Sequence, residues 1–208
     1  MSRNFKIEID GYYHLYNRGN NKRVIFETQS DYERFICLLY ICNNVESVHM
    51  SNISFHRGST LMESVFSLPT KPIVAIGAYC LMPNHFHLLI REITRDGTSL
   101  FMQKLSTAYT MYFNKKKDAT GSLFQGRFKA ESAEFDPYLK YLFSYIHLNP
   151  IKLIEPKWKE TGIKNRIEAK KYLSTFSYSS YFDYLGKKRA IVKIIQQNNS
   201  TITLSKIF

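Results

Sequence analysis

Residues 73–91 decide the fold class, and they read IVAIGAYCLMPNHFHLLIR. The first half is rich in β-branched and aromatic residues, which favour a strand, and Met82-Pro83-Asn84 predicts a turn. The second half continues as a strand to Arg91, so the whole stretch predicts a β-hairpin. Because side chains alternate between the two faces of a strand, the second strand has two sets of residues, His85, His87 and Leu89 on one face and Phe86, Leu88 and Ile90 on the other.

The remaining elements extend this hairpin into an α+β fold. An alternating stretch predicts a strand over 12–18, and a capping-box pattern at Ser30-Asp31-Tyr32-Glu33 begins an amphipathic helix that ends near Asn44. Residues 45–72 show no clear period and are predicted to be a long loop or insertion. Further along we predict a helix from Asp96 to Lys117, a strand within 123–131, and a helix over 138–149 after the start signal Asp136-Pro137.

The order of these elements predicts how they are arranged. The order β-α-β-β-α-β, followed by a helix, is that of the ferredoxin-like (split βαβ) fold with an antiparallel sheet. We therefore predict a domain over residues 1–150 and a basic, mostly helical C-terminal extension over 151–208.

Composition indicates a globular protein with an anionic partner. The chain has 208 residues, 44% of them hydrophobic, and a formal charge of +12, so a nucleic acid is the simplest partner. Three cysteines without CxxC spacing argue against a disulfide scaffold or a cysteine zinc site. No apolar run reaches the roughly 18 residues of a membrane span, and the N-terminal residues have no apolar signal core. We expect a cytoplasmic, nucleoid-associated protein that does not bind a membrane.

The extension carries most of the net positive charge. Residues after Pro150 include 12 Lys or Arg and 4 Asp or Glu, so they contribute +8 of the net charge. Six aromatic residues are interleaved with these charges, and such a mixture is used to bind unpaired bases. An ordinary helical subdomain with solvated lysines is the alternative explanation. The six aromatic residues are Tyr172, Phe176, Tyr178, Tyr181, Phe182 and Tyr184.

Two histidines separated by one residue form a candidate metal site. The Cα atoms of His85 and His87 are expected to lie about 6–7 Å apart on one strand face, so both rings can bind one divalent ion. Simple packing or surface polarity is the alternative explanation for such a pair.

The predicted helix over 138–149 offers a candidate nucleophile. Tyr145 and Asn149 share one face of that helix, and a tyrosine hydroxyl can form a covalent intermediate. Attack at neutral pH needs a base or a polarised electrophile. Tyr138, Tyr141 and His147 are nearby alternatives, and a structural role for Tyr145 stays open in a chain with 15 tyrosines.

Four longer segments occur together in one known family. They are YHLYNRGNNKRVIF (13–26), AYCLMPNHFHLLI (78–90), GSLFQGRFKAE (121–131) and YLKYLFSYIHLNPIK (138–152). In this order they resemble the small single-tyrosine HUH transposases, in particular the REP-associated tyrosine transposases and their insertion-sequence relatives. A weaker similarity at YSSYFDYLG (178–186) has Tyr178 where Trp is usual. The resemblance covers residues 12–186.

The resemblance implies a site and a reaction. His85 and His87 correspond to the metal-binding histidines of the HUH motif, Tyr145 corresponds to the nucleophile, and Asn149 corresponds to a third, Gln-type ligand in some relatives. The implied cofactor is Mg²⁺ or Mn²⁺. The implied reaction is cleavage and joining of single-stranded DNA beside a hairpin, through a 5′-phosphotyrosine link.

The basic turns supply candidates for DNA contact. Their glycines, Gly19 and Gly126, allow close approach of a ligand or simply a tight turn. If residues 123–131 form a strand, Arg127 and Lys129 share one of its faces. The candidates for DNA backbone and base contacts are Arg18, Lys22, Arg23, Arg127 and Lys129.

Two other functions are alternatives to the enzyme. One is a domesticated, non-cleaving protein that binds structured DNA or RNA, and the other is an RNA endonuclease or RNA-binding regulator. The joint presence of His85, His87 and Tyr145 favours the enzyme, since binding alone needs none of them.

Family members usually have a shorter connection in place of residues 45–72. They occur as monomers and as dimers, so we expect a monomer or a homodimer.

Overall fold

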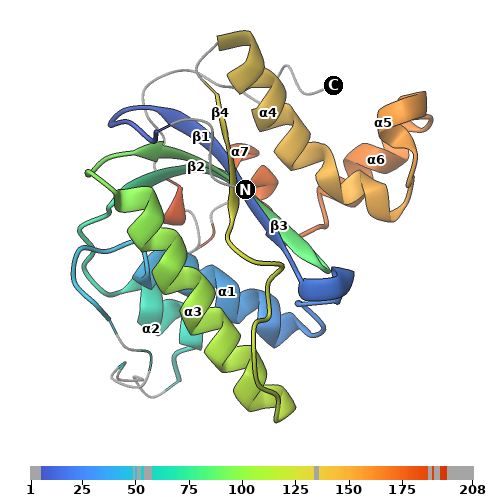
Figure 1. Cartoon of the computed structure of the whole chain (residues 1–208). Helices are drawn as coiled ribbons and strands as arrows, with labels where there is room; N and C mark the ends of the chain where they lie inside the picture. The colour runs from blue at the N-terminus through green and yellow to red at the C-terminus, as the bar shows by residue number, and fades with distance from the viewer. Residues whose placement is uncertain are drawn as a thin grey trace.

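The computed structural model describes residues 6–48, 50, 53, 58–133, 136–186, 189 and 193–195. Figure 1 shows a twisted sheet with helices on both of its faces. In chain order, with η for a 3-10 helix, the elements are β1 (Tyr12–Arg18), η1 (Asn20–Lys22), α1 (Gln29–Ile41), α2 (Leu61–Phe66), β2 (Val74–Met82), β3 (His85–Glu92), α3 (Gly97–Lys117), β4 (Lys129–Ser132), α4 (Asp136–Leu148), η3 (Asn149–Leu153), α5 (Trp158–Thr161), α6 (Arg166–Leu173) and α7 (Tyr181–Tyr184).

The four strands form one sheet in the order β2-β3-β1-β4, and all neighbouring pairs are antiparallel. The predicted hairpin is present, with Met82 of β2 paired to His85 of β3. The pairing shifts by one residue between Ile76 and Ala78, where Gly77 forms a bulge. The α+β class and the antiparallel sheet are confirmed, whereas the ferredoxin-like label stays a prediction.

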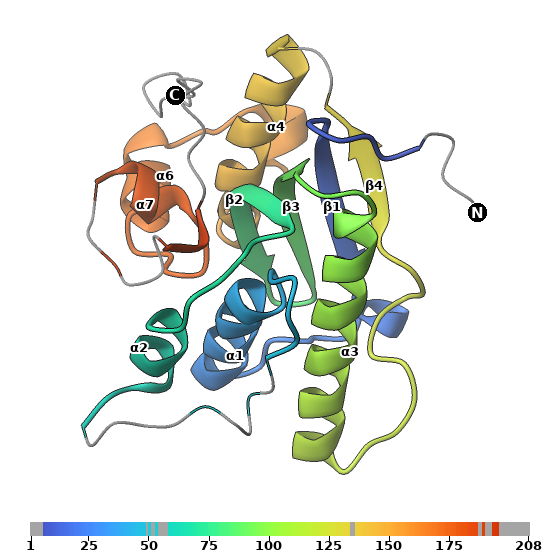
Figure 2. The ribbon, with the colours of Figure 1, turned by 90° about the vertical axis from the view of Figure 1, so that its left-hand side faces the viewer.

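The sheet separates two hydrophobic clusters. α1 and α3 pack on one face together with Phe86, Leu88 and Ile90 of β3. α4 packs on the other face together with Leu89. Figure 2 shows this arrangement, with α4 on one side of the sheet and α1 and α3 on the other. The predicted alternation of β3 is therefore confirmed, and its histidines face α4.

α1 begins earlier than its predicted capping box. The structure uses Thr28 as the N-cap in place of Ser30, and the carboxylate of Asp31 accepts hydrogen bonds from the backbone N–H groups of Glu27 and Thr28, both at 2.9 Å. Lys116 of α3 also donates to Asp31, at 2.6 Å. The sequence contains both capping patterns. The buried carboxylate of Asp31, whose charge Lys116 compensates, favours the pattern that begins at Thr28.

α3 starts at the predicted place but by a different device. Asp96 has a left-handed backbone with φ 59°, and its side chain makes no capping hydrogen bond. The carboxylate of Glu92, at the end of β3, instead accepts hydrogen bonds from the hydroxyl of Thr98 and from its backbone N–H, the latter at 2.9 Å. The cap thus comes from the preceding strand.

Residues 45–72 contain α2, so the prediction of a long loop without secondary structure is wrong for this segment. Thr60 and Glu63 form a capping box. Val65 and Phe66 are buried in the same cluster as α1, because this short helix has one apolar face against the domain. Residues 49, 51, 52 and 54–57 of this segment lie outside the described part of the chain.

β4 is shorter and later than the strand predicted within 123–131. Phe124 forms only an isolated bridge with Gly19, and Gly126 has φ 83°, a left-handed conformation that interrupts the strand. Arg127 precedes β4 and therefore does not share a strand face with Lys129, which corrects the prediction. Gly19 has no room for a side chain, since a Cβ there would lie 2.3 Å from the carbonyl oxygen of Arg23.

The C-terminal extension packs against α4 and the free edge of β2. The backbone N–H of Leu81 donates to the carbonyl of Tyr178, and that of Tyr79 donates to the hydroxyl of Ser180, both at 2.9 Å. Ala169, Leu173 and Tyr181 join the hydrophobic cluster of α4. The division at residue 150 stays a prediction, and one cluster holds residues from both sides of it.

Packing accounts for most of the aromatic residues of the extension. Tyr178 stacks on Tyr32 of α1 with 3.7 Å between ring centroids. Tyr181 and Phe182 are 6% and 9% exposed, and the hydroxyl of Tyr184 donates to the carbonyl of Gly77 at 2.5 Å. Tyr178, Tyr181 and Tyr184 thus join the extension to the domain.

Two further features of the fold concern its cysteines and the character of its helices. Cys37, Cys42 and Cys80 are free and buried, and burial raises the pKa of the Cys37 and Cys42 thiols to about 12. Within the described residues, none of the helices combines the length and the apolar character needed to cross a membrane.

Candidate active site

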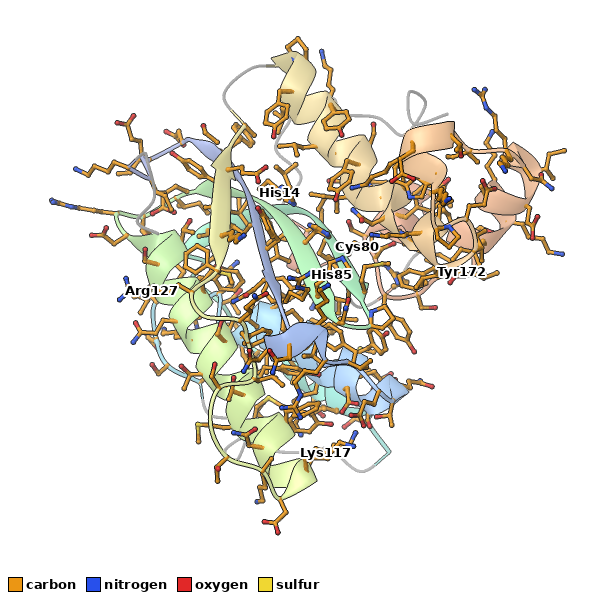
Figure 3. All side chains as sticks on the ribbon, turned by 45° about the vertical axis from the view of Figure 1, so that its right-hand side comes forward. His14, Cys80, His85, Lys117, Arg127 and Tyr172 are labelled. Atoms are coloured by element: carbon orange, nitrogen blue, oxygen red, sulfur yellow. The ribbon has the colours of Figure 1, made fainter. Side chains whose placement is uncertain are left out.

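The candidate site lies on the face of β1 and β3 that α4 covers. The strand pairing places Tyr16 opposite His87 and Arg18 opposite His85. Since alternate residues share a face, His14 joins the two histidines on this face. Figure 3 shows His14 and His85 at different heights along the neighbouring strands β1 and β3, with α4 on the same side of the sheet.

His14 and His87 contact each other directly. Nε2 of His14 lies 2.9 Å from Nδ1 of His87, and the two stacked rings have centroids 5.0 Å apart. Burial lowers the pKa of both rings, and for His87 the neighbouring His14 and His85 lower it further. Neutral rings result near pH 7, so one nitrogen of this contact donates and the other accepts.

His85 is oriented by the residue before it. Its Nδ1 lies 2.6 Å from Oδ1 of Asn84, whose Nδ2 donates to the carbonyl of Lys22 at 3.2 Å. Burial lowers the pKa of His85 to about 4, and the charges of Lys152 and Arg18 act in the same direction. Nδ1 of His85 therefore carries the proton, which leaves the lone pair on Nε2.

α4 places Tyr145 over the histidine rings. The centroid of the Tyr145 ring is 5.5 Å from that of His87 and 6.0 Å from that of His14, and both contacts are edge-on. The hydroxyl of Tyr145 accepts a hydrogen bond from Nζ of Lys159 at 2.7 Å. Asn149, only 2% exposed, donates through Nδ2 to the carbonyl oxygen of Tyr145 at 2.9 Å. The predicted nucleophile and histidine pair are thus brought together.

A carboxylate borders the same face. Glu131 of β4 accepts a hydrogen bond from the hydroxyl of Tyr16 at 2.8 Å, and it lies 3.7 Å from Nδ1 of His14. Burial, then the hydrogen bond to Glu131, raises the pKa of Tyr16 to about 12. Glu131 on β4, His14 on β1 and His87 on β3 thus form a chain of polar contacts, and Tyr16 joins this chain through Glu131.

Sequence reasoning missed three side chains of this site. His14 and Glu131 lie within two of the family-like segments, and strand alternation places His14 on the histidine face once β1 and β3 are paired. Lys159 carries no comparable signal, because it is one lysine among many in the basic extension.

The alternatives near Tyr145 have different surroundings. His147 is fully buried, and Nε2 of its ring lies 2.7 Å from the hydroxyl of Ser180, so it joins α4 to the extension. Burial lowers the pKa of His147 to about 3. Tyr138 and Tyr141 are 37% and 59% exposed, and their rings and that of Tyr145 form a ladder with 6.1 Å between successive centroids.

The candidates for DNA contact are spread over three places. Arg18 and Lys129 border the site: Arg18 donates to Gln125 at 3.0 Å, and Nζ of Lys129 is 6.0 Å from the Tyr16 ring centroid. Lys22 and Arg23 lie in and after η1, and the guanidinium of Arg23 lies over the Phe113 ring. Arg127 lies toward α3 and away from His85, as Figure 3 shows.

The described residues of this site do not enclose a metal ion with His, Cys, Asp and Glu ligands alone. Among the described residues, no group of three or more His, Cys, Asp and Glu side chains is placed to hold a metal ion. A divalent ion at His85 and His87 thus needs ligands of another type, such as an amide, water or phosphate oxygen.

The family of the chain follows from its comparison with known proteins. The family model for "Transposase IS200 like" matches residues 9–149, a segment that contains both histidines of the pair, Tyr145 and Asn149. The chain belongs to the IS200-like transposase family. No curated protein sequence matches it significantly.

The fold of this IS200-like transposase is shared with a solved structure. A REP-associated tyrosine transposase bound to a REP hairpin is similar with a TM-score of 0.55, at 14% identity, over 97% of this chain and 93% of that one. At this identity the similarity concerns the fold. The resemblance predicted from the four sequence segments is thereby confirmed at the level of the family.

Proposed function

We propose that this transposase cleaves and rejoins single-stranded DNA at a site beside a hairpin, with Tyr145 as the nucleophile. The observation that carries this proposal is the position of Tyr145, whose ring lies edge-on to His87 with its hydroxyl bonded to Lys159. Membership of a transposase family supports the reaction class.

The residues present fit a divalent metal, Mg²⁺ or Mn²⁺. Hydrogen bonds engage Nδ1 of His85 and Nδ1 of His87, so Nε2 of each neutral ring is available as a ligand. Asn149 uses its Nδ2 for a hydrogen bond, which leaves its amide oxygen for the ion. When bound there, the ion would supply Lewis-acid polarisation of a phosphate oxygen.

The protein groups account for the bonds made and broken. Oη of Tyr145 attacks the DNA phosphorus, the bond from phosphorus to the 3′-oxygen breaks, and the hydroxyl proton ends on the released 3′-OH. The product is a 5′-phosphotyrosine link, which keeps the energy of the broken phosphodiester bond. Attack by another 3′-OH on that link reverses the step and joins two strands without ATP.

The surface beside Tyr145 suits an unpaired strand. The exposed rings of Tyr138 and Tyr141 lead along α4 to Tyr145 and offer stacking faces for bases. Arg18 and Lys129 border the same face, and we expect them to contact phosphates. Loss of one such ring by Tyr141→Ala should weaken single-strand binding by about 1–3 kcal/mol, whereas Tyr141→Trp should keep it, as anisotropy titrations would measure.

A covalent-complex assay tests the proposed reaction. The full chain is incubated with DNA hairpins that carry single-stranded flanks, with Mn²⁺ or with EDTA, and denatured in SDS. We expect a metal-dependent complex that Tyr145→Phe abolishes and Tyr141→Phe retains. An equal yield from Tyr145→Phe would exclude Tyr145 as the nucleophile.

The same assay separates the alternative functions. Binding that falls steeply with salt, without a covalent complex under any metal, would indicate a non-cleaving binding protein. Competition between matched DNA and RNA hairpins reports which nucleic acid is preferred, because the 2′-hydroxyl distinguishes them.

A further inference from the structure

Lys159 is the one side chain whose described hydrogen bond reaches the reacting atom of the proposed nucleophile. Its Nζ donates to Oη of Tyr145 at 2.7 Å and lies 4.0 Å from the centroid of the same ring. The ammonium is thus placed beside the hydroxyl and over the edge of the ring at once.

The surroundings of Lys159 leave its charge available. The ion pairs found among the described residues do not include it. Its positive charge contributes to lowering the pKa of His14, His85 and His87. Within the described part of the chain, no carboxylate therefore neutralises the ammonium at the place where the hydroxyl must lose its proton.

Short, anchored elements hold Lys159 in this position. α5 follows η3 directly, and Trp158, next to Lys159, packs against the cluster that also contains α4. The loop after α5 is fixed by Glu155, whose carboxylate accepts hydrogen bonds from the backbone N–H groups of Lys164 and Asn165 at 3.0 and 3.3 Å. The backbone that carries Lys159 is thus tied to the helix that carries Tyr145.

We propose that Lys159 is a catalytic residue that stabilises the negative charge which develops on Oη of Tyr145. This inference rests on the proposed function. During attack, the ammonium keeps its three protons while Oη loses its own and bonds to phosphorus. During rejoining, Oη leaves phosphorus with the electron pair of the broken bond, and the same ammonium faces the charge. The same lysine thus acts in both cleavage and rejoining.

A variant series tests the role of the charge. Lys159→Met removes the ammonium and keeps the length of the chain, Lys159→Arg keeps a positive charge, and Lys157→Met removes a neighbouring exposed lysine as a control. For covalent-complex formation in single turnover at saturating DNA, we expect Lys159→Met to be slower by about 100- to 1,000-fold. Lys159→Arg should recover most of the rate, and Lys157→Met should match the original chain.

A second readout needs neither DNA nor metal. An aryl sulfonyl fluoride probe labels tyrosines by attack of the phenolic oxygen on sulfur with release of fluoride, and peptide mass spectrometry reports each site. Lys159→Met should slow labelling of Tyr145 and leave that of Tyr141, which lies about one helical turn away on α4, unchanged.

The two readouts separate the two proposals. Labelling that depends on Lys159 without any DNA complex would contradict the proposed function and keep the role of Lys159. A DNA complex that forms normally in Lys159→Met, or a loss of DNA affinity alone with unchanged single-turnover rate and Tyr145 labelling, would overturn the role of Lys159 and keep the function.

Discussion

Replacement of His14 by phenylalanine tests whether the second buried histidine orients the first. His14→Phe keeps a ring that can stack on His87 and removes the nitrogen that faces its Nδ1, 2.9 Å away. His14→Gln is the matched rescue, because its amide can again accept a hydrogen bond near the position of Nε2. Both variants keep the neighbouring strand residues unchanged.

The magnitude follows from the burial of the contact. His14 and His87 are only 4% and 6% exposed. In His14→Phe, Nδ1 of His87 therefore loses its partner without gaining water, which lowers the free energy of unfolding by about 1–3 kcal/mol. Loss of the group that orients a histidine ligand typically weakens metal binding about 10- to 100-fold, which equals about 1.4–2.8 kcal/mol.

Calorimetric titration of the protein with Mn²⁺ measures the effect without DNA or catalysis. We expect His14→Phe to bind Mn²⁺ about 10- to 100-fold more weakly and His14→Gln to lie closer to the original chain. Thermal unfolding of each variant serves as the control for folding. Unchanged Mn²⁺ affinity in a folded His14→Phe protein would show that His14 does not orient His87 for metal binding.

Three further predictions concern stability. Hydrogen bonds, the one from Lys116 foremost, outweigh burial and lower the pKa of Asp31 to about 2. Its contribution to the free energy of unfolding is therefore present above pH 4 and is lost as the pH falls toward 2. Asp31→Asn should lower the free energy of urea unfolding by about 2 kcal/mol at pH 7, and by less at pH 2. Phe143→Ala, at a site only 2% exposed, should cost about 3–5 kcal/mol, against little change for the exposed Tyr141→Ala; equal costs would contradict the described packing of α4. Gly19→Ala should cost about 1–3 kcal/mol, because its Cβ would lie 2.3 Å from a carbonyl oxygen, and an unchanged melting temperature would argue against this tight turn.

Local sequence patterns predicted the parts of the fold that have a strong period. β1 matches its predicted range, and the alternation of β3 correctly placed His85 and His87 together on one face. These predictions succeed because burial of one strand face requires the pattern itself.

Errors occurred where a tertiary contact decides between local options. The start of α1 depends on a lysine from α3 that compensates Asp31, and the cap of α3 comes from Glu92 of the preceding strand. A short helix such as α2 has too few residues to show a period. β4 is cut short by the left-handed Gly126, a conformation that a sequence permits without requiring.

The sequence patterns named the central residues of the candidate site and did not name those at its border. The family-like segments identified the histidine pair and Tyr145, which the fold brings together on one side of the sheet. His14 and Glu131 come from strands whose pairing must be known first. Lys159 reaches the site only through the path of η3 and α5, which no local pattern determines.

Mapping of the DNA-linked residue shows whether Tyr145 is the nucleophile. A covalent complex made with Mn²⁺ is treated with nuclease and protease, and its peptides are sequenced by mass spectrometry. We predict a single nucleotide-bearing residue, Tyr145, joined through a 5′-phosphate. A nucleotide found instead on Tyr138 or Tyr141, or a cleaved strand with no linked peptide, would contradict the account.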